Sequence, residues 1–258
     1  IDDNVESNVM KVIDIKIKFN DPFKVSKEAS TKFISNSFKL AHKLALRKDV
    51  MGIINCPINK KLLRKNLGVT ELLASKCKVK NNSEVMLIRN KSFSVTPITT
   101  HIDIKSVSSK LTINRIINKS ITINSWYKKI FKRKPIIGIL GLNPHNVELR
   151  KDSEEMRVII PAIKKLKKMN FKIFGPLVAD TIFMRDYKKY DVVVGMYHDQ
   201  VLAPFKTIFK FDAINITLGL KYLRISPDHG TAINLIGKNK ANAGSLLNSI
   251  RFINKYGL

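Results

Sequence analysis

Three of the five histidines follow short apolar stretches that have the pattern of buried strands, namely His101, His145 and His198. In α/β proteins, ligands bind at the carboxyl ends of strands, where the loops converge. Three imidazoles at such ends can bind a divalent cation and leave coordination positions open for a substrate. The sequence has no H-x-x-x-H pair that would place two ligands on one helix. The spacing therefore leaves two alternatives open, a metal site or three loop histidines that bind backbone groups.

The other two histidines have different surroundings. His229 lies in the turn Ser226–Gly230, ahead of a short predicted helix. A helix start beside glycine suits a phosphate or a nucleotide, and a plain turn fits the same residues equally well. His42 lies inside a predicted helix and is expected to be structural. The patterns G-x-G-x-x-G, G-x-S-x-G and G-x-x-x-x-G-K-[ST] are absent, which excludes a standard Rossmann site, an α/β-hydrolase elbow and a P-loop.

Hydrophobic periodicity predicts strands that alternate with helices. The first long helix is predicted over Lys27–Leu46, with Ser26 as its N-cap, and the clearest one over Ser153–Met169. The predicted strands are Met51–Cys56, Glu84–Ile88, Ser92–Ile98, Pro135–Leu142, Phe171–Phe174, Asp191–Met196, Ala213–Leu218 and Tyr222–Ile225. This alternation indicates an α/β sandwich with a mainly parallel sheet.

Composition narrows the class of protein. The chain has 258 residues, 44% of them hydrophobic, which supports a sizeable core and excludes a wholly disordered chain. Its two cysteines, Cys56 and Cys77, exclude a disulfide framework, and no apolar run is long enough to span a membrane. The formal net charge is +27, but lysine outnumbers arginine 37 to 10 and is spread along the chain. Drift in composition explains this charge better than a specific nucleic-acid surface. We expect a cytoplasmic protein whose field favours anionic small molecules.

Five motifs stand in the order found in one enzyme family. They are Gly141–His145, Gly175–Thr181, Met196–Gln200, Asn215–Leu220 and Asp228–Ala232. With them, the chain resembles the 4-hydroxythreonine-4-phosphate dehydrogenases of pyridoxal phosphate biosynthesis, from about residue 20 to its C-terminus. The resemblance implies metal-dependent oxidation of 4-phosphohydroxy-L-threonine with NAD or NADP. Loss of CO₂ from the resulting 3-keto acid would then give 3-amino-2-oxopropyl phosphate.

The resemblance also implies a fold. We expect the α/β fold of the isocitrate and isopropylmalate dehydrogenases, a two-domain α/β/α sandwich with the active-site cleft between its domains. The first domain would comprise residues 1–61 and 240–258, and the second, with the metal and substrate residues, 62–239. The family's N-terminal strand and its Gly-Glu-Pro-Ala-Gly-Ile-Gly loop have no counterpart before Asn20. The first domain is therefore expected to be N-terminally truncated, with an exposed edge or apolar face.

Metal and substrate residues follow from the resemblance. The divalent metal, which would be Zn, Mg or Co, is expected to bind to His101, His145 and His198. The imidazole of His198 would be supplied across the interface of a homodimer. Contacts with the phosphorylated amino-acid substrate are expected from Thr70, Lys206, Asn215 and Arg224. Both cations suit a phosphate or a carboxylate, because they stay charged at neutral pH. The family has Gly-His-Thr-Glu where this chain has Val69 in the histidine position, so one imidazole contact with the substrate is lost.

The cofactor residues lie near the C-terminus. The stretch that contains them looks like the adenosine loop of the isocitrate and isopropylmalate dehydrogenases, which bind nicotinamide cofactors without a Rossmann fingerprint. The residues expected to bind NAD or NADP are His229, Gly230, Ala232 and Asn242. This loop would explain why the fingerprint is missing here.

The expected mechanism needs a Lewis acid on the hydroxyl that is oxidised. The protein would position the cofactor, which accepts the hydride. The candidates for proton transfer, or for orienting other groups, are Asp180, Asp199 and Asp228. The sequence does not decide which residue is the base, which metal binds, or whether NAD or NADP is used. Three alternatives stay open: a metal-dependent phosphatase with the same histidines, a Lys-rich nucleic-acid-binding module, and an inactive fragment.

Overall fold

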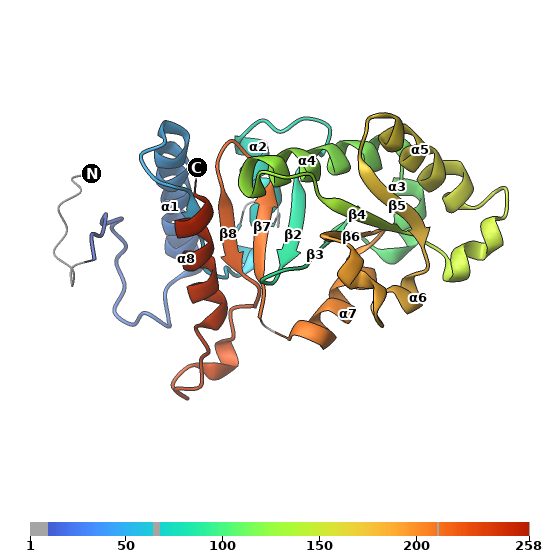
Figure 1. Ribbon diagram of the computed structural model, residues 1–258. Coiled ribbons are helices and arrows are strands. Elements are labelled where there is room, and N and C mark those ends of the chain that lie inside the picture. Colours follow the sequence, from blue (N-terminus) through green and yellow to red (C-terminus); the bar gives the residue numbers. More distant parts are fainter. Residues whose placement is uncertain (1–9, 64–67, 211, 258) are drawn as a thin grey trace.

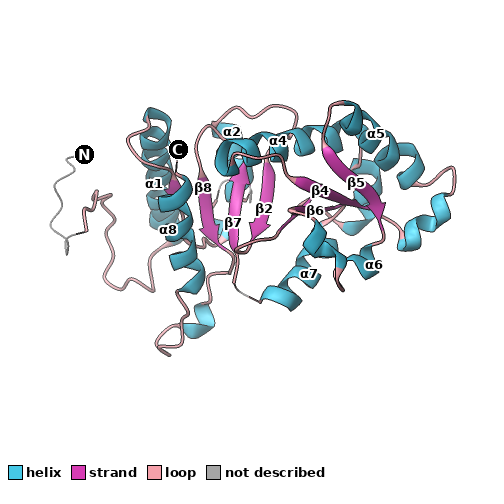
Figure 2. Ribbon diagram, viewed as in Figure 1, coloured by secondary structure: helices cyan, strands magenta, loops and turns pink. Residues whose placement is uncertain are grey.

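The computed structural model describes residues 10–63, 68–210 and 212–257 (Figures 1 and 2). Within these ranges, eight strands form one sheet in the order β1-β8-β7-β2-β3-β6-β4-β5. The strands are β1 (Ile53–Ile54), β2 (Val85–Arg89), β3 (Ser94–Pro97), β4 (Ile136–Leu140), β5 (Lys172–Leu177), β6 (Val192–Gly195), β7 (Ile214–Leu218) and β8 (Arg224–Pro227). Each predicted strand is present, with its ends moved by a few residues.

The sheet of the described residues is mixed: four of its seven strand pairs are parallel and three are antiparallel, so the prediction of a mainly parallel sheet holds by a narrow margin. The pairs β1/β8, β3/β6, β4/β6 and β4/β5 are parallel, whereas β2/β3, β2/β7 and β7/β8 are antiparallel. Short turns join β2 to β3 and β7 to β8. A short turn reverses the chain, and only a longer crossover can return it for a parallel strand.

Helices cover both faces of the sheet. They are α1 (Lys27–Arg47), α2 (Val69–Lys76), α3 (Val107–Lys110), α4 (Ile113–Phe131), α5 (Ile160–Lys168), α6 (Ala179–Ile182), α7 (His198–Phe209) and α8 (Gly244–Tyr256), with a π-helix, η5 (Glu155–Ile159), directly before α5. Short 3-10 helices lie between these elements in the described segments. None of the helices in these segments has the length and apolar character needed to cross a membrane.

Two helix starts show how the sequence sets local structure. Ser26 caps α1 as predicted, because its Oγ accepts a hydrogen bond from the Ala29 backbone N–H at 3.2 Å. The helix predicted over Ser153–Met169 is present, but it begins as the π-helix and becomes α5. Pro161 lacks the backbone N–H that an α-helix would need there, so the hydrogen-bond pattern changes next to it.

The side chains of β7 alternate between the two cores of the sheet. Ile214, Ile216 and Leu218 belong to the core that α4, α5 and α8 cover. Asn215 and Thr217 pair with residues of β2 that pack under α7, so they lie on the opposite face. Successive residues of a strand point to opposite faces. This alternation delivers two polar side chains to the face that α7 covers.

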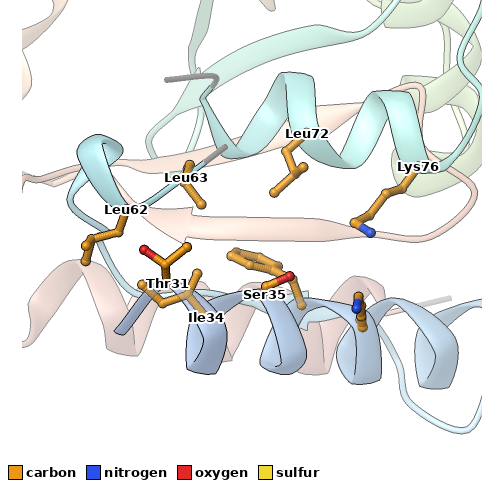
Figure 3. Close-up of a pocket in the computed structure, with 9 residues that line it drawn as sticks. Thr31, Ile34, Ser35, Leu62, Leu63, Leu72 and Lys76 are labelled. Atoms are coloured by element: carbon orange, nitrogen blue, oxygen red, sulfur yellow. The ribbon is translucent and has the colours of Figure 1, made fainter. Parts of the chain in front are cut away.

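A third, smaller core joins α1 to α2. Figure 3 shows side chains of the two helices facing each other across a cavity of about 160 Å³. Its lining is mainly apolar and includes Ile34 and Leu72, with Lys76 towards one end. None of the predicted site residues lines this cavity, so we regard it as a packing gap between the helices.

The sheet crosses the predicted domain boundary. β1 lies in the range predicted for the first domain and pairs with β8, which lies in the range predicted for the second. Both parts therefore contribute to one α/β sheet, of which β1 and β5 are the edges. The division into 1–61 plus 240–258 and 62–239 stays a prediction, and so does the N-terminal truncation of the first domain.

One lysine of α4 is buried. Lys119 is 3% exposed, and its Nζ donates a hydrogen bond to the backbone oxygen of Glu84. Burial lowers the pKa of Lys119 from 10.5 to about 8, against an opposing effect of the Glu84 carboxylate. The folded protein therefore holds this proton less tightly than the unfolded chain does.

Replacing this lysine tests the lowered pKa. Because the folded pKa lies below the unfolded one, the contribution of Lys119 to stability rises with pH between about 8 and 10.5. Lys119→Met removes the titration and keeps an unbranched side chain. We expect the stability of the variant, relative to the unchanged protein, to fall by about 3 kcal/mol across this window. Urea unfolding of both proteins at several pH values measures the difference, and a difference that does not change with pH would contradict the lowered pKa.

Candidate functional site

Two of the three predicted metal ligands lie side by side at one edge of the sheet. His101 follows β3, and His198 is the first residue of α7, directly after β6. β3 and β6 are parallel neighbours, so their carboxyl ends meet at the same edge. The ring centroids of the two histidines are 5.5 Å apart. The expected placement at neighbouring strand ends is therefore observed for this pair.

A carboxylate lies near the Nδ1 atom of each of these rings. Asp199 Oδ1 is 2.6 Å from His198 Nδ1, and Glu71 Oε1 is 3.7 Å from His101 Nδ1. Carboxylates in such positions fix the orientation of an imidazole ring and make it a better metal ligand. This arrangement leaves the Nε2 atoms to interact with a metal ion or a substrate.

The third predicted ligand follows β4, the parallel neighbour of β6. His145 is exposed in the loop after β4. Among the residues that the structure describes, no three His, Cys, Asp or Glu side chains are grouped so that they could hold a metal ion. His198 lies beside His101 of its own chain, and its contribution across a homodimer interface stays a prediction. The full metal site stays a prediction.

A buried carboxylate fixes the start of the loop that carries His145. Glu155 Oε1 accepts hydrogen bonds from the backbone N–H groups of Leu142 and Asn143, both at 2.8 Å, and its Oε2 accepts one from Asn143 Nδ2 at 3.0 Å. Burial raises the pKa of Glu155, but these donors outweigh it and hold the pKa below its ordinary value. The ionised carboxylate therefore anchors the loop to η5.

Gln200 links the two strand ends that lead to His145 and His198. Its Nε2 donates to the backbone oxygen of Gly141 after β4 at 2.7 Å. Its Oε1 accepts a hydrogen bond from the backbone N–H of Met196 after β6 at 2.6 Å. A single side chain thus sets the spacing between the two loops.

Arg224 is a deeply buried cation at the start of β8. It is 3% exposed, its Nε donates to Asn55 Oδ1 at 2.7 Å, and its Nη1 donates to Thr217 Oγ1 at 2.9 Å. Burial lowers the pKa of Arg224 to about 10, against an opposing effect of the Glu71 carboxylate. The guanidinium therefore stays charged at neutral pH. No side chain of the described ranges accepts from its Nη2, which leaves donors for an anion.

Two more of the predicted substrate residues lie on the same face as Arg224. Thr70, in the first turn of α2, places its Oγ1 3.2 Å from Thr217 Oγ1. Asn215 Oδ1 is buried and has no hydrogen-bond partner in the part of the chain that is described. A buried acceptor without a partner is costly, so this atom suits a ligand that brings a donor.

Lys206 and Asp228 form an ion pair between α7 and the end of β8. Lys206 Nζ lies 3.5 Å from Asp228 Oδ2. Burial raises the pKa of Asp228, and Lys206 opposes this rise. The Asp228 backbone N–H also donates to Ser245 Oγ of α8 at 3.0 Å. Among the three acid–base candidates, Asp228 is buried beside a cation, Asp199 contacts His198, and Asp180 is exposed in α6.

The predicted cofactor residues lie on the exposed loop between β8 and α8. His229 is partly buried, whereas Gly230, Ala232 and Asn242 are exposed. Asn242 Oδ1 accepts a hydrogen bond from the backbone N–H of Gly244 at 2.7 Å, at the start of α8. The loop is therefore accessible to a ligand, and the cofactor roles of these residues stay predictions.

Several residues that hold the site were not predicted. They are Asn55, Glu71, Gln200 and Thr217. Glu71 and Gln200 belong to sequence motifs from which only neighbouring residues were predicted to be functional. Asn55 and Thr217 carry a different signal, because each is a polar residue in or beside a buried strand, where it needs a hydrogen-bond partner.

Comparison with known proteins identifies the family. The family model described as "Pyridoxal phosphate biosynthetic protein PdxA" matches residues 2–253. The chain belongs to the PdxA family. A 4-hydroxythreonine-4-phosphate dehydrogenase from Sulfurihydrogenibium sp. is 38% identical over 258 residues, which cover 97% of this chain and 78% of the relative. The crystal structure of a 4-hydroxythreonine-4-phosphate dehydrogenase from Klebsiella pneumoniae superposes with a TM-score of 0.78 at 32% identity and covers 90% of this chain and 72% of that one.

Not all PdxA relatives carry the same substrate in their names. A D-threonate 4-phosphate dehydrogenase from Salmonella typhimurium is 36% identical over 220 residues, which cover 83% of this chain and 66% of that relative. These relatives are dehydrogenases, so the expected oxidoreductase is confirmed, and neither the phosphatase nor the nucleic-acid module is favoured. A β-decarboxylating dehydrogenase from Thermococcus kodakarensis shares the fold alone, with a TM-score of 0.50 at 9% identity.

The hydroxyl of Thr217 can be tested with a matched pair of substitutions. Thr217→Val keeps the shape of the side chain and removes the acceptor of the Arg224 hydrogen bond. We expect this variant to lose about 1–3 kcal/mol of stability, because a buried charged donor loses its partner. Thr96→Val is the control, since Thr96 is equally buried but its Oγ1 has no partner within the described residues. We expect it to change stability by less than about 0.5 kcal/mol or to raise it. Equal losses in urea unfolding would contradict the role of Thr217.

Proposed function

We propose that this PdxA protein oxidises 4-phosphohydroxy-L-threonine with NAD or NADP and releases 3-amino-2-oxopropyl phosphate. A nicotinamide cofactor, when bound, would accept the hydride that leaves C3 as the C3 hydroxyl loses its proton, and the product of this oxidation would be a ketone. This ketone would be β to the carboxylate, so the C1–C2 bond would break with release of CO₂ and its electron pair would form an enolate with the C3 carbonyl. Uptake of a proton at C2 would then give the product. The support is family membership together with the buried polar face of β7 and β8.

The main support for the proposal is the positive charge at the buried polar face of β7 and β8. The substrate has a carboxylate, a phosphate and an amino group. Arg224 is a fixed, buried cation with donors to spare, and Lys206 is a second cation on α7. Asn215 Oδ1 is a buried acceptor without a partner in the described chain, as an ammonium or hydroxyl donor requires. Two cations and one acceptor are complementary to two anionic groups and one donor.

We propose that His101 and His198 hold a divalent metal ion, with His145 as a third ligand. Two adjacent imidazoles that are each backed by a carboxylate form a donor set that Zn²⁺ and Co²⁺ accept. When bound, such an ion would lower the pKa of the substrate hydroxyl. Glu71 and Asp199 would hold the rings so that their Nε2 atoms stay available. We also propose a homodimer with a metal site shared across its interface, for which sedimentation is the direct measurement.

The nicotinamide cofactor would bind at the exposed loop after β8. His229, Gly230, Ala232 and Asn242 lie on this loop, close in sequence to the buried Asp228. Asn242 already fixes the start of α8, which would give the loop one firm end. No feature of this loop selects between NAD and NADP, so the assay distinguishes them.

D-Threonate 4-phosphate is the second candidate substrate. It carries a hydroxyl where 4-phosphohydroxy-L-threonine carries its amino group, and one PdxA relative is named for it. Val69, partly buried beside Thr70, stands where the family resemblance has a histidine. A changed contact at the position of Val69 would alter which substrate is recognised, and it would not alter the hydroxyl that is oxidised.

The assay compares both substrates with each cofactor. We expect reduction of the cofactor and stoichiometric release of CO₂ with 4-phosphohydroxy-L-threonine. Activity with D-threonate 4-phosphate alone would move the assignment to the second candidate. Absence of cofactor reduction with either compound, in a dimeric and folded sample with added Zn²⁺, Co²⁺ or Mg²⁺, would contradict the proposed function.

The metal ligands can be tested without turnover. We expect His101→Gln and His198→Gln each to weaken Zn²⁺ binding at least about tenfold in calorimetry, because each removes a nitrogen ligand. We expect the same of His145→Ala, because it removes the proposed third ligand. His42→Gln is the control, since His42 Nδ1 lies 2.8 Å from the Tyr222 hydroxyl and serves the packing of α1. Undiminished Zn²⁺ affinity in the first two variants would refute the assignment.

Arg224→Lys tests the proposed substrate cation. A lysine ammonium cannot keep the contacts with Asn55 and Thr217 and also present a two-bond donor to an anion. We expect the KM for the substrate to rise about tenfold or more, while the KM for the nicotinamide cofactor changes little. Equal increases in both constants would show that Arg224 does not bind the substrate.

A further inference from the structure

A second concavity lies on the face of β7 opposite to Asn215 and Thr217. Its volume is about 320 Å³, and it lies between the start of β7, the turn after β2 and the helix α8. We call it the basic-aromatic pocket, because its lining includes Arg89, Lys91, Arg251, Lys255, Phe252 and Tyr256. Its volume falls within the range of about 300–1,000 Å³ that small-molecule sites occupy.

The basic-aromatic pocket keeps a net positive charge, because four cations and one carboxylate of the described chain line it. In the described ranges, none of its four cations forms an ion pair. Its lining includes Asp212, and that carboxylate accepts a hydrogen bond from Asn248 Nδ2 at 2.9 Å. Four cations around a concave surface focus the field there and attract anions more strongly than lysines on an open helix face do.

Arg89 is already fixed in place. Its Nη1 donates to Ser94 Oγ at 2.9 Å and to the Tyr127 hydroxyl at 3.3 Å, and its Nη2 donates to the Lys91 backbone oxygen at 3.1 Å. The guanidinium also lies 4.6 Å from the centre of the Phe131 ring. Within the described chain its Nε has no recorded acceptor. A cation that is held in this way loses little freedom when it binds a ligand.

Aromatic rings form the apolar part of the same wall. Phe252 and Tyr256 have ring centroids 4.7 Å apart, and Phe131 lies 5.1 Å from Tyr256. Both lining rings are only partly buried, so part of each is available for contact. Lys255 Nζ lies 5.2 Å from the centre of the Tyr256 ring, which places a cation directly beside an aromatic surface. Planar heterocycles stack on such rings.

We propose that the basic-aromatic pocket binds a nucleoside phosphate. The phosphate would interact with Arg89, Arg251 and Lys255, and the base would pack against Phe252 and Tyr256. Because Ile214 lines the pocket and Asn215 faces α7, the pocket and the substrate face lie on opposite sides of one strand. The pocket is therefore a second site, and its occupation does not depend on the proposed function.

Calorimetry with AMP as the probe tests the proposal, and NADH is titrated separately into the same proteins so that a cofactor site can be told apart. We expect AMP to bind, and the double variant Arg251→Ala/Lys255→Ala to bind it at least tenfold more weakly. Both side chains are exposed, so their truncation leaves the core intact. The matched control is Lys164→Ala/Lys165→Ala on α5, which removes two exposed cations outside the pocket and should change AMP affinity less than twofold.

Four results would overturn the proposal. These are no binding of AMP, an equal loss of affinity in the control pair, inorganic phosphate binding as tightly as AMP, and an equal loss of NADH affinity in the pocket variant. The second would assign the binding to general charge, and the third would remove the role of the rings. The fourth would make the pocket part of the cofactor site.

Discussion

A buried guanidinium must have its donors met and its charge balanced, and at Arg224 this requirement shapes the rest of the site. Asn55 after β1 and Thr217 of β7 accept its hydrogen bonds, so both strands that flank β8 must keep their register. The Glu71 carboxylate supports the charge from α2. Thr70 adds a contact between α2 and β7. One cation thus ties a helix and three strands to a common point.

The strands and their ends could be predicted because a buried strand is visible in the sequence as a run of apolar residues. An apolar run of five or six residues that stops at a polar one indicates a strand and its edge, which is how His101, His145 and His198 were found. The orientation of the strands was less accessible, since it depends on whether a connection is a turn or a crossover. The antiparallel pairs β2/β3 and β7/β8 follow from two short turns, which the apolar pattern alone does not distinguish from crossovers.

The sequence placed His145 at the end of a strand, which is where it lies after β4, but it could not predict how the loop is held. Its loop is held by Glu155 and Gln200, whose partners are backbone groups on other elements. Such contacts depend on the folded arrangement and leave no periodic pattern. Family resemblance could name His145 as a ligand, but the described residues of a single chain do not form a group of three ligands.

The strand β7 serves two unrelated environments through alternate residues. Ile214, Ile216 and Leu218 fill an apolar core, while Asn215 and Thr217 face the substrate side. A shift of this strand by one residue would exchange the two sets, because side chains repeat every second position. Insertion or deletion of a single residue inside Ile214–Leu218 would therefore bury an amide and a hydroxyl in the core and expose isoleucines to the guanidinium. We expect evolution to tolerate changes of side chain along this strand far more readily than changes of its length.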